Sequence, residues 1–113
     1  MTATPVPPTS SADVVLLGRL GTRVDLRDLP SGDTVTVFTV VVDRPRGSGP
    51  PGSPVKVDAI PCQAFRAGVA RRLASLEPGE WVRVEGRLRR RFWRSGAGLA
   101  SAMEVEVSRL QRC

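Results

Sequence analysis

Histidine and tyrosine are absent from this sequence of 113 residues, and cysteine occurs only at Cys62 and Cys113. Without histidine the chain lacks the commonest general base and the commonest metal ligand, and Ser–His and Cys–His catalytic pairs are excluded. The two cysteines form no C-x-x-C motif, which argues against a zinc site and against a disulfide framework. We expect no metal, no cofactor, a reduced setting such as the cytosol, and a buried position for Cys62.

Long apolar runs are missing as well. No segment reaches the roughly 18 consecutive apolar residues of a membrane helix, and no basic-then-apolar leader opens the chain. No glycine-rich loop ends in GK[ST], and the carboxylates show no metal-ligand spacing. Glu104 and Glu106, two residues apart in a predicted strand, are expected on a solvated face. These absences predict a binding protein rather than an enzyme, with no membrane contact and no small-molecule substrate.

Positive charge is abundant, and it is unevenly distributed. Basic residues outnumber acidic ones by 17 to 11, and all but Lys56 are arginines. Residues 1–43 carry three arginines and five aspartates, whereas residues 44–113 carry 14 basic and six acidic residues. A localised basic surface points to phosphate or another polyanion as ligand. Composition alone leaves open the alternative of a solvated, arginine-rich surface.

The pattern along the chain predicts five strands and one helix. An uncharged segment with three prolines, residues 1–12, is expected to be a disordered leader. Apolar and β-branched runs predict strands over 13–26, 34–43, 55–64, 81–93 and 100–110. A helical stripe over 65–76 ends at Pro78-Gly79, and the proline- and glycine-rich segment 44–54 is a long loop.

The order of these elements is β-β-β-α-β-β, with the helix between the third and fourth strands. This is the order of the OB-fold, an all-β, five-stranded Greek-key barrel. Gly18 and Gly21 would supply the sharp bend that barrel closure requires of the first strand. We therefore expect one OB-fold domain over residues 13–110, followed by a C-terminal stub, 111–113. Pro61, inside the third strand, indicates a sheet edge or a bulge.

The segment RVEGRLRRRFWR, residues 83–94, contains six arginines, one phenylalanine and one tryptophan. Since alternate strand residues share a face, Arg87, Arg89, Arg91 and Trp93 project together, and Phe92 falls on the inward side. Guanidinium groups beside an indole suit a single-stranded nucleic acid, because arginine neutralises phosphates and the ring stacks a base. The alternative is an exposed charged strand with Trp93 folded over a neighbour.

The loop at 44–54 is basic and carries no acidic residue. Loops between OB-fold strands wall the nucleic-acid groove, so Arg44, Arg46 and the following Lys56 are candidate phosphate contacts. A plain surface connection is the alternative.

Three segments resemble the bacterial single-stranded DNA-binding protein (SSB) family. They are VVLLGRLGTRVDLRDLPSGDTVTVFTVVVD at 14–43, IPCQAFRAGVARRLASLEPGEWVRVEGRLRRRFW at 60–93, and MEVEVSRL at 103–110. The resemblance implies base stacking on Trp93, after the VEGxLRxR run, and on Phe65, just before the helix. Two further stacking positions of the family fall at Ala59 and near Arg46, so they are not aromatic here.

The family usually forms homotetramers, so the resemblance makes a homotetramer the expected state, with the apolar Val55 and Val57 as candidate interface residues. The family also usually carries a long tail with an acidic, hydrophobic tip. This sequence stops at Cys113, which suggests either a trimmed chain or a short, tail-less paralogue.

The sequence as a whole predicts a cytoplasmic, nucleoid-associated protein that binds single-stranded DNA without sequence preference in replication, recombination or repair. Arg44, Arg46, Lys56, Arg87, Arg89 and Arg91 would contact phosphates, and Phe65 and Trp93 would stack bases. The alternative function is an accessory OB-fold subunit of primosomal type that binds proteins and has weak nucleic-acid affinity. Binding of RNA is also left open, because stacking and phosphate contacts do not read the sugar.

Overall fold

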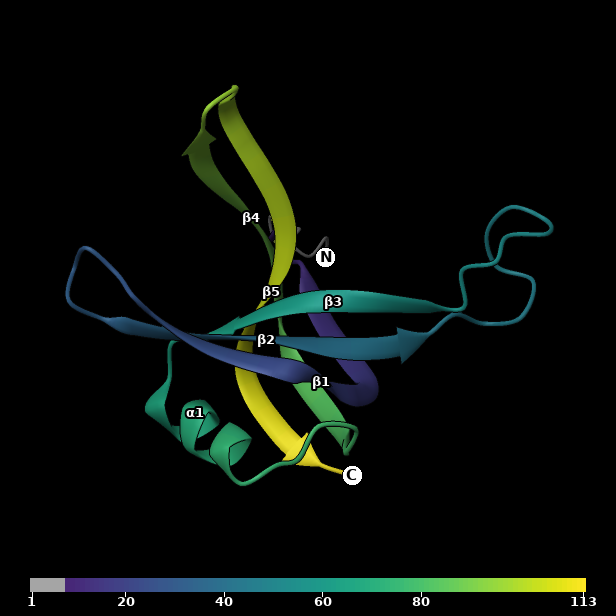
Figure 1. The fold of residues 1–113 in the computed structure, drawn as a ribbon, viewed down its shortest axis with the longest axis horizontal. Coiled ribbons are helices and arrows are strands. Elements are labelled where there is room, and N and C mark those ends of the chain that lie inside the picture. The colour runs from purple at the N-terminus through teal and green to yellow at the C-terminus, as the bar shows by residue number, and fades with distance from the viewer. Residues whose placement is uncertain (1–7) are drawn as a thin grey trace, which may run out of the picture.

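The computed structural model of the protein describes residues 8–113 and contains five strands and one helix (Figure 1). The elements are β1 (Asp13–Asp28), β2 (Thr34–Asp43), β3 (Val57–Ala64), α1 (Ala67–Ala74), β4 (Trp81–Ser95) and β5 (Gly98–Arg112). The predicted order is thus confirmed. Residues 1–7 of the expected leader lie outside the described residues, and residues 8–12 are in neither helix nor strand.

The five strands close into a barrel in the order β1-β2-β3-β5-β4, and β1 also pairs with β4. Every pairing is antiparallel except the one between β3 and β5, which is parallel and joins only Cys62 and Gln63 to Val105 and Glu106. A closed five-stranded barrel with its helix between β3 and β4 is the OB-fold that the sequence predicts.

The first strand pairs with both β2 and β4 and so closes the barrel, which it can do because it bends. Its pairing with β2 shifts register between Leu20 and Val24, close to the two glycines expected to bend it. A Cβ at Gly18 would press on the backbone carbonyl of Val41 more closely than real side chains ever do. Glycine here therefore permits a close approach of two strands that closure requires.

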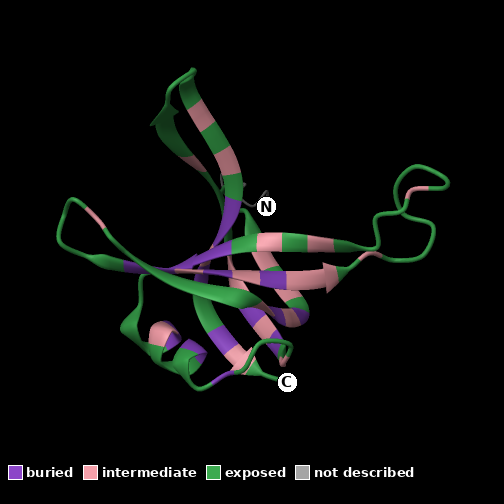
Figure 2. Cartoon of the chain, in the orientation of Figure 1, coloured by how far each residue is buried: buried purple, intermediate pink, exposed green. Residues whose placement is uncertain are grey.

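The core is formed by inward-facing apolar side chains of all five strands, closed at one end by the helix (Figure 2). Phe38, Val82 and Val84 are among its most completely buried members, and α1 contributes Val69 and Leu73. The helix carries only eight residues, so it is shorter than the segment 65–76 predicted from its apolar stripe. It covers the lower end of the barrel in Figure 1.

Pro61 pairs with Thr39 of β2 without any shift in register. Since β3 reaches β5 only at the next two residues, Pro61 has a strand neighbour on one side, and the absence of an N–H is tolerated there. The edge interpretation is therefore correct. Ile60, Cys62 and Ala64 face the core as expected.

Three parts of the structure extend away from the barrel: the β1–β2 turn, the loop 44–56 and the β4–β5 hairpin (Figure 1). In the hairpin no side chain from Glu85 to Met103 is buried. Phe92 lies on the face that alternation assigned to the core, yet it is 59% exposed. The expectation of an inward Phe92 was wrong, because the strand continues beyond the barrel and nothing covers that face there.

Candidate nucleic-acid interface

The basic face of the hairpin consists of Arg87, Arg89, Arg91 and Trp93 of β4 and the residues paired with them on β5. In register these partners are Glu106, Glu104, Ala102 and Ala100. The strand pattern thus places the four residues on one face, as predicted, and the register adds two carboxylates that the sequence pattern did not place there. We call this set the Arg-Trp face.

All three arginines of the Arg-Trp face are paired with these carboxylates. Glu106 receives Arg87 Nε at 3.2 Å and lies 3.6 Å from an Nη of Arg89. Arg91 Nε lies 3.2 Å from a carboxylate oxygen of Glu104. Each guanidinium group therefore has a carboxylate partner, and two carboxylates offset part of the positive charge of the three arginines before any ligand arrives.

Glu104 departs from the solvated position expected for it. It is only 3% exposed, and its Oε2 accepts a hydrogen bond from Arg91 Nε at 3.3 Å, whereas Oε1, 3.2 Å from the same nitrogen in the ion pair, accepts no hydrogen bond. Burial raises the pKa of the neighbouring Cys62 thiol to about 12, and the Glu104 carboxylate adds to that shift. The sequence alone gives no sign that Glu104 is buried. Its place beside Arg89 and its ion pair with Arg91 follow only from the register of β4 and β5.

Both candidate stacking rings lie against guanidinium groups of the Arg-Trp face. Arg91 sits 4.5 Å from the centroid of the Trp93 ring, and Arg89 sits 5.9 Å from that of Phe65. These distances suit cation–π contacts. Trp93 is 37% exposed and Phe65 is 41% exposed, so each ring keeps surface free for a flat ligand. The structure thus brings a ring from the β3–α1 junction and a ring from β4 to one surface.

A pocket of about 380 Å³ adjoins this surface, and Phe65 is one of its lining residues. Arg66 and Arg87 supply its positive charge and Asp13 and Glu106 its negative charge, and Gly86 also lines it. Its mixed lining can take the phosphate and sugar of a strand whose base rests on the Phe65 ring.

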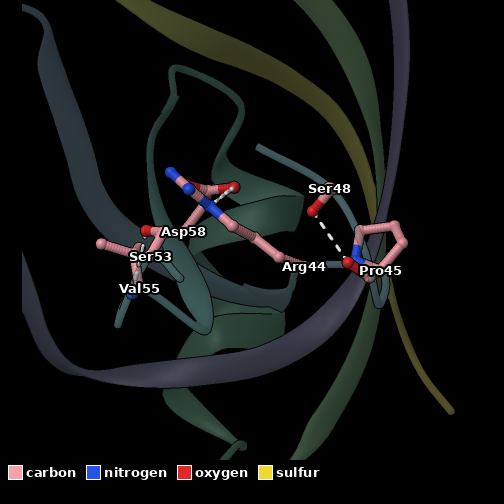
Figure 3. A network of polar contacts seen from close by, with 6 residues as sticks. All are labelled: Arg44, Pro45, Ser48, Ser53, Val55 and Asp58. Carbon is pink, nitrogen blue, oxygen red and sulfur yellow. Dashed lines mark hydrogen bonds and ion pairs between the residues drawn. The ribbon is translucent and has the colours of Figure 1, made fainter. Parts of the chain in front are cut away.

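The loop 44–56 holds the other three candidates, and its base is fixed by an ion pair (Figure 3). Arg44 donates from Nε at 3.1 Å and from an Nη at 2.8 Å to the carboxylate of Asp58. This contact lowers the pKa of the Asp58 carboxyl. Arg44 is therefore engaged in holding the loop, a role that its place in a basic segment did not reveal.

Arg46 and Lys56 are exposed and form no ion pair within residues 8–113. Together with Arg44 they line a hollow of about 410 Å³ enclosed by the loop. The loop and the β4–β5 hairpin leave the barrel in different directions (Figure 1). The structure therefore unites five of the predicted residues on the hairpin side, and it leaves the three residues of the loop apart from them.

Trp81 is the other tryptophan, and the sequence did not decide its environment. It starts β4 at the opposite end of that strand from Trp93 and is 47% exposed, with Arg19 5.4 Å from its ring centroid. Arg19 is itself paired with Asp43 at 2.8 Å. The ring is thus exposed rather than packed on the helix end, and it lies far from the Arg-Trp face.

In the part of the chain that the structure describes, no group of three or more cysteine, aspartate and glutamate side chains could hold a metal ion. None of the described helices is long and apolar enough to cross a membrane.

Comparison with known proteins shows the family to which the chain belongs. The model of the "Single-strand binding protein family" matches residues 12–113. A single-stranded DNA-binding protein of Thermotoga maritima is 37% identical over 91 residues, 75% of this chain and 60% of that protein. Single-stranded DNA-binding protein 3 of Listeria innocua is 33% identical over 85 residues, 75% of this chain and 52% of that protein. The chain thus spans little more than half the length of these relatives.

Two solved structures are similar in fold. A Plasmodium falciparum SSB in complex with single-stranded DNA superposes with a TM-score of 0.76 and 20% identity, over 96% of this chain and 99% of that one. The mitochondrial single-stranded DNA-binding protein Rim1 of S. cerevisiae superposes with a TM-score of 0.70 and 12% identity, over 92% and 96%. The family model matches nearly all described residues, and the closed barrel with its one helix is the fold of these two structures. The chain therefore belongs to the single-strand binding protein family.

Proposed function

We propose that this protein binds single-stranded DNA without sequence preference and acts in replication, recombination or repair, at the nucleoid in the cytoplasm. The observation that carries the proposal is the Arg-Trp face with the adjoining Phe65 ring, where each of two partly exposed rings lies against a guanidinium group. Bases offer a π-face whatever their identity, so such a surface binds any sequence. The chemistry is binding alone and includes no catalytic step.

In this proposal Trp93 and Phe65 stack bases, and the neighbouring arginines contact phosphates. Incoming phosphates replace the Glu106 carboxylate as the partner of Arg87 and Arg89. Arg91 stays with the buried Glu104 and supports the Trp93 ring from one side, which leaves the other side for a base. Arg46 and Lys56 contact phosphates of a longer strand that reaches the loop 44–56.

We further propose that the protein assembles as a homotetramer. Supporting this, Val15 and Leu17 are exposed on β1, Val57 is exposed at the start of β3, and Val55 is exposed in the loop just before it. Exposed apolar side chains favour association with another copy. Light scattering at micromolar concentration should give four times the mass of the chain, and a monomer mass would reject this part of the proposal.

The test of DNA binding compares Trp93→Ala with Trp81→Ala, the same change at an exposed tryptophan away from the Arg-Trp face. Each protein is titrated with poly-dT, and the parent also with poly-U and duplex DNA. Trp93→Ala removes one stack and should weaken binding by about 1–3 kcal/mol, or roughly 5- to 150-fold in affinity, whereas Trp81→Ala should bind like the parent. Phe65→Ala should also weaken binding with little change in melting temperature.

Equal affinities for both variants and the parent would show that Trp93 does not touch DNA. The accessory-subunit function would then be preferred, and one observation favours it independently: the arginines of the Arg-Trp face already have carboxylate partners. Tighter binding to poly-U than to poly-dT would move the proposal from DNA to RNA.

A further inference from the structure

The β4–β5 hairpin has a second face, opposite the Arg-Trp face, that the described chain leaves exposed except at its barrel end. On β4 it presents Leu88, Arg90, Phe92 and Arg94. The pairing places Val105, Met103, Ser101 and Leu99 of β5 beside them in that order. We call this the reverse face. Apart from Val105, which belongs to the core, its side chains are exposed.

The reverse face has a central ring flanked by positive charge. Phe92, at 59% the most exposed aromatic side chain among the described residues, lies between Arg90 and Arg94 on the same side of the strand. Alternate residues on a strand are about 7 Å apart, so one ring and two guanidinium groups span about 14 Å.

These two arginines differ from those of the Arg-Trp face in having no carboxylate partner. Arg90 donates from an Nη to Ser101 Oγ at 3.1 Å, and neither Arg90 nor Arg94 forms an ion pair within residues 8–113. The carboxylates of Glu104 and Glu106 lie on the opposite side of the hairpin. The reverse face therefore carries uncompensated positive charge around an exposed ring.

We propose that the reverse face is a second contact surface for single-stranded nucleic acid, with Phe92 stacking a base and Arg90 and Arg94 binding the phosphates on either side. A strand bound on the Arg-Trp face would continue round the hairpin onto this face, so the hairpin would be held between two stretches of one ligand. The inference rests on the proposed DNA binding and extends it to residues that the Arg-Trp face does not include.

The alternative occupant is a second copy of the chain, because Leu88, Leu99 and Met103 are apolar. A two-fold contact would bring the same surface of both copies together, and with it four guanidinium groups and no carboxylate. Single-stranded nucleic acid complements both properties at once, since it offers flat apolar bases and a phosphate for each nucleotide. Charge complementarity thus favours nucleic acid.

The experiment measures the affinity of the full chain for a labelled oligo-dT. One OB-fold covers at most about 16 nucleotides, and the oligo-dT is longer than that. Phe92→Leu keeps the apolar character of the side chain but removes its π-face. A double variant, Arg90→Gln with Arg94→Gln, removes the two charges. Its matched control is Arg71→Gln with Arg72→Gln on α1, at the far end of the molecule from the hairpin tip in Figure 1.

Phe92→Leu should weaken binding about fivefold or more, as the loss of one stack does. The Arg90/Arg94 variant should make the slope of log K against log salt shallower by about 1.4, because each phosphate contact on a single strand contributes about 0.7. The α1 variant should keep the parent slope, and all variants should keep the parent mass in light scattering.

Parent-like affinity and slope in both hairpin variants, while Trp93→Ala binds more weakly, would overturn the reverse face and leave the proposed function intact. A parent protein that does not bind oligo-dT would overturn both. A lower mass for Phe92→Leu would show that the reverse face joins copies of the chain, and the inference would then be wrong.

Discussion

Replacing Glu106 by glutamine should strengthen the binding of single-stranded DNA. In the structure this carboxylate is the shared partner of Arg87 and Arg89, at 3.2 and 3.6 Å. A phosphate that approaches either guanidinium must displace the carboxylate or approach its negative charge. Glutamine keeps the length and shape of the side chain and removes the charge, so both arginines become available.

The size of the effect follows from the exposure of these groups. The Arg87 side chain is 68% exposed and that of Glu106 27%, so the pairs are partly screened by water. Such pairs contribute about 0–1 kcal/mol each to stability, and the variant should melt close to the parent. Release of two such pairs should improve DNA binding by about 1 kcal/mol, or roughly fivefold in affinity. A newly gained phosphate contact should steepen the salt dependence by about 0.7 in slope.

The assay is a titration of a labelled oligo-dT at several salt concentrations, with Glu77→Gln as the control. Glu77 is exposed in the segment after α1, away from the hairpin, and its substitution changes the net charge by the same amount. The Glu77 variant should gain little affinity. Weaker binding by Glu106→Gln would refute the reasoning, since the carboxylate would then serve to orient the arginines rather than to compete with DNA. An equal gain in both variants would show that only total charge matters.

Three further results are expected. Val84→Asp should abolish the folded state in circular dichroism, because it places an unpaired charge at a fully buried core position, and a cooperative melt near the parent temperature would contradict this. A thiol reagent at pH 8 should modify Cys113 and spare Cys62 in the native protein, since burial raises the pKa of Cys62 to about 12, and should modify both after unfolding. Arg46→Gln should reduce affinity for long oligo-dT more than Arg44→Gln does, because Arg44 is engaged in an ion pair at the base of its loop; the reverse order would mean that this pair opens on binding.

Local patterns predicted the elements and the faces of the barrel strands. In β4, Val82 and Val84 alternate with Arg83 and Glu85, and that period of two decides which side chains can reach the core. The sequence predicts one helix between β3 and β4, although this helix ends at Ala74, before the Pro78-Gly79 pair, and the glycines of β1 mark where that strand bends. These properties depend on neighbours in the chain, so the residues themselves predict them, and with them the fold and the placing of Arg87, Arg89, Arg91 and Trp93 on one face.

The register and reach of the strands were decided by the tertiary structure. Alternation states which way Phe92 points, but whether that side is covered depends on where the barrel ends, and the hairpin extends beyond it. The partners of Arg91 and Arg44 are 13 and 14 residues away along the chain, Glu104 across the hairpin and Asp58 across the loop. Such contacts are set by the pairing of strands, and composition alone cannot separate a free arginine from a neutralised one. The sequence by itself thus determined the fold and the kind of ligand to expect, whereas only the folded barrel decided which charges and rings are free to meet it.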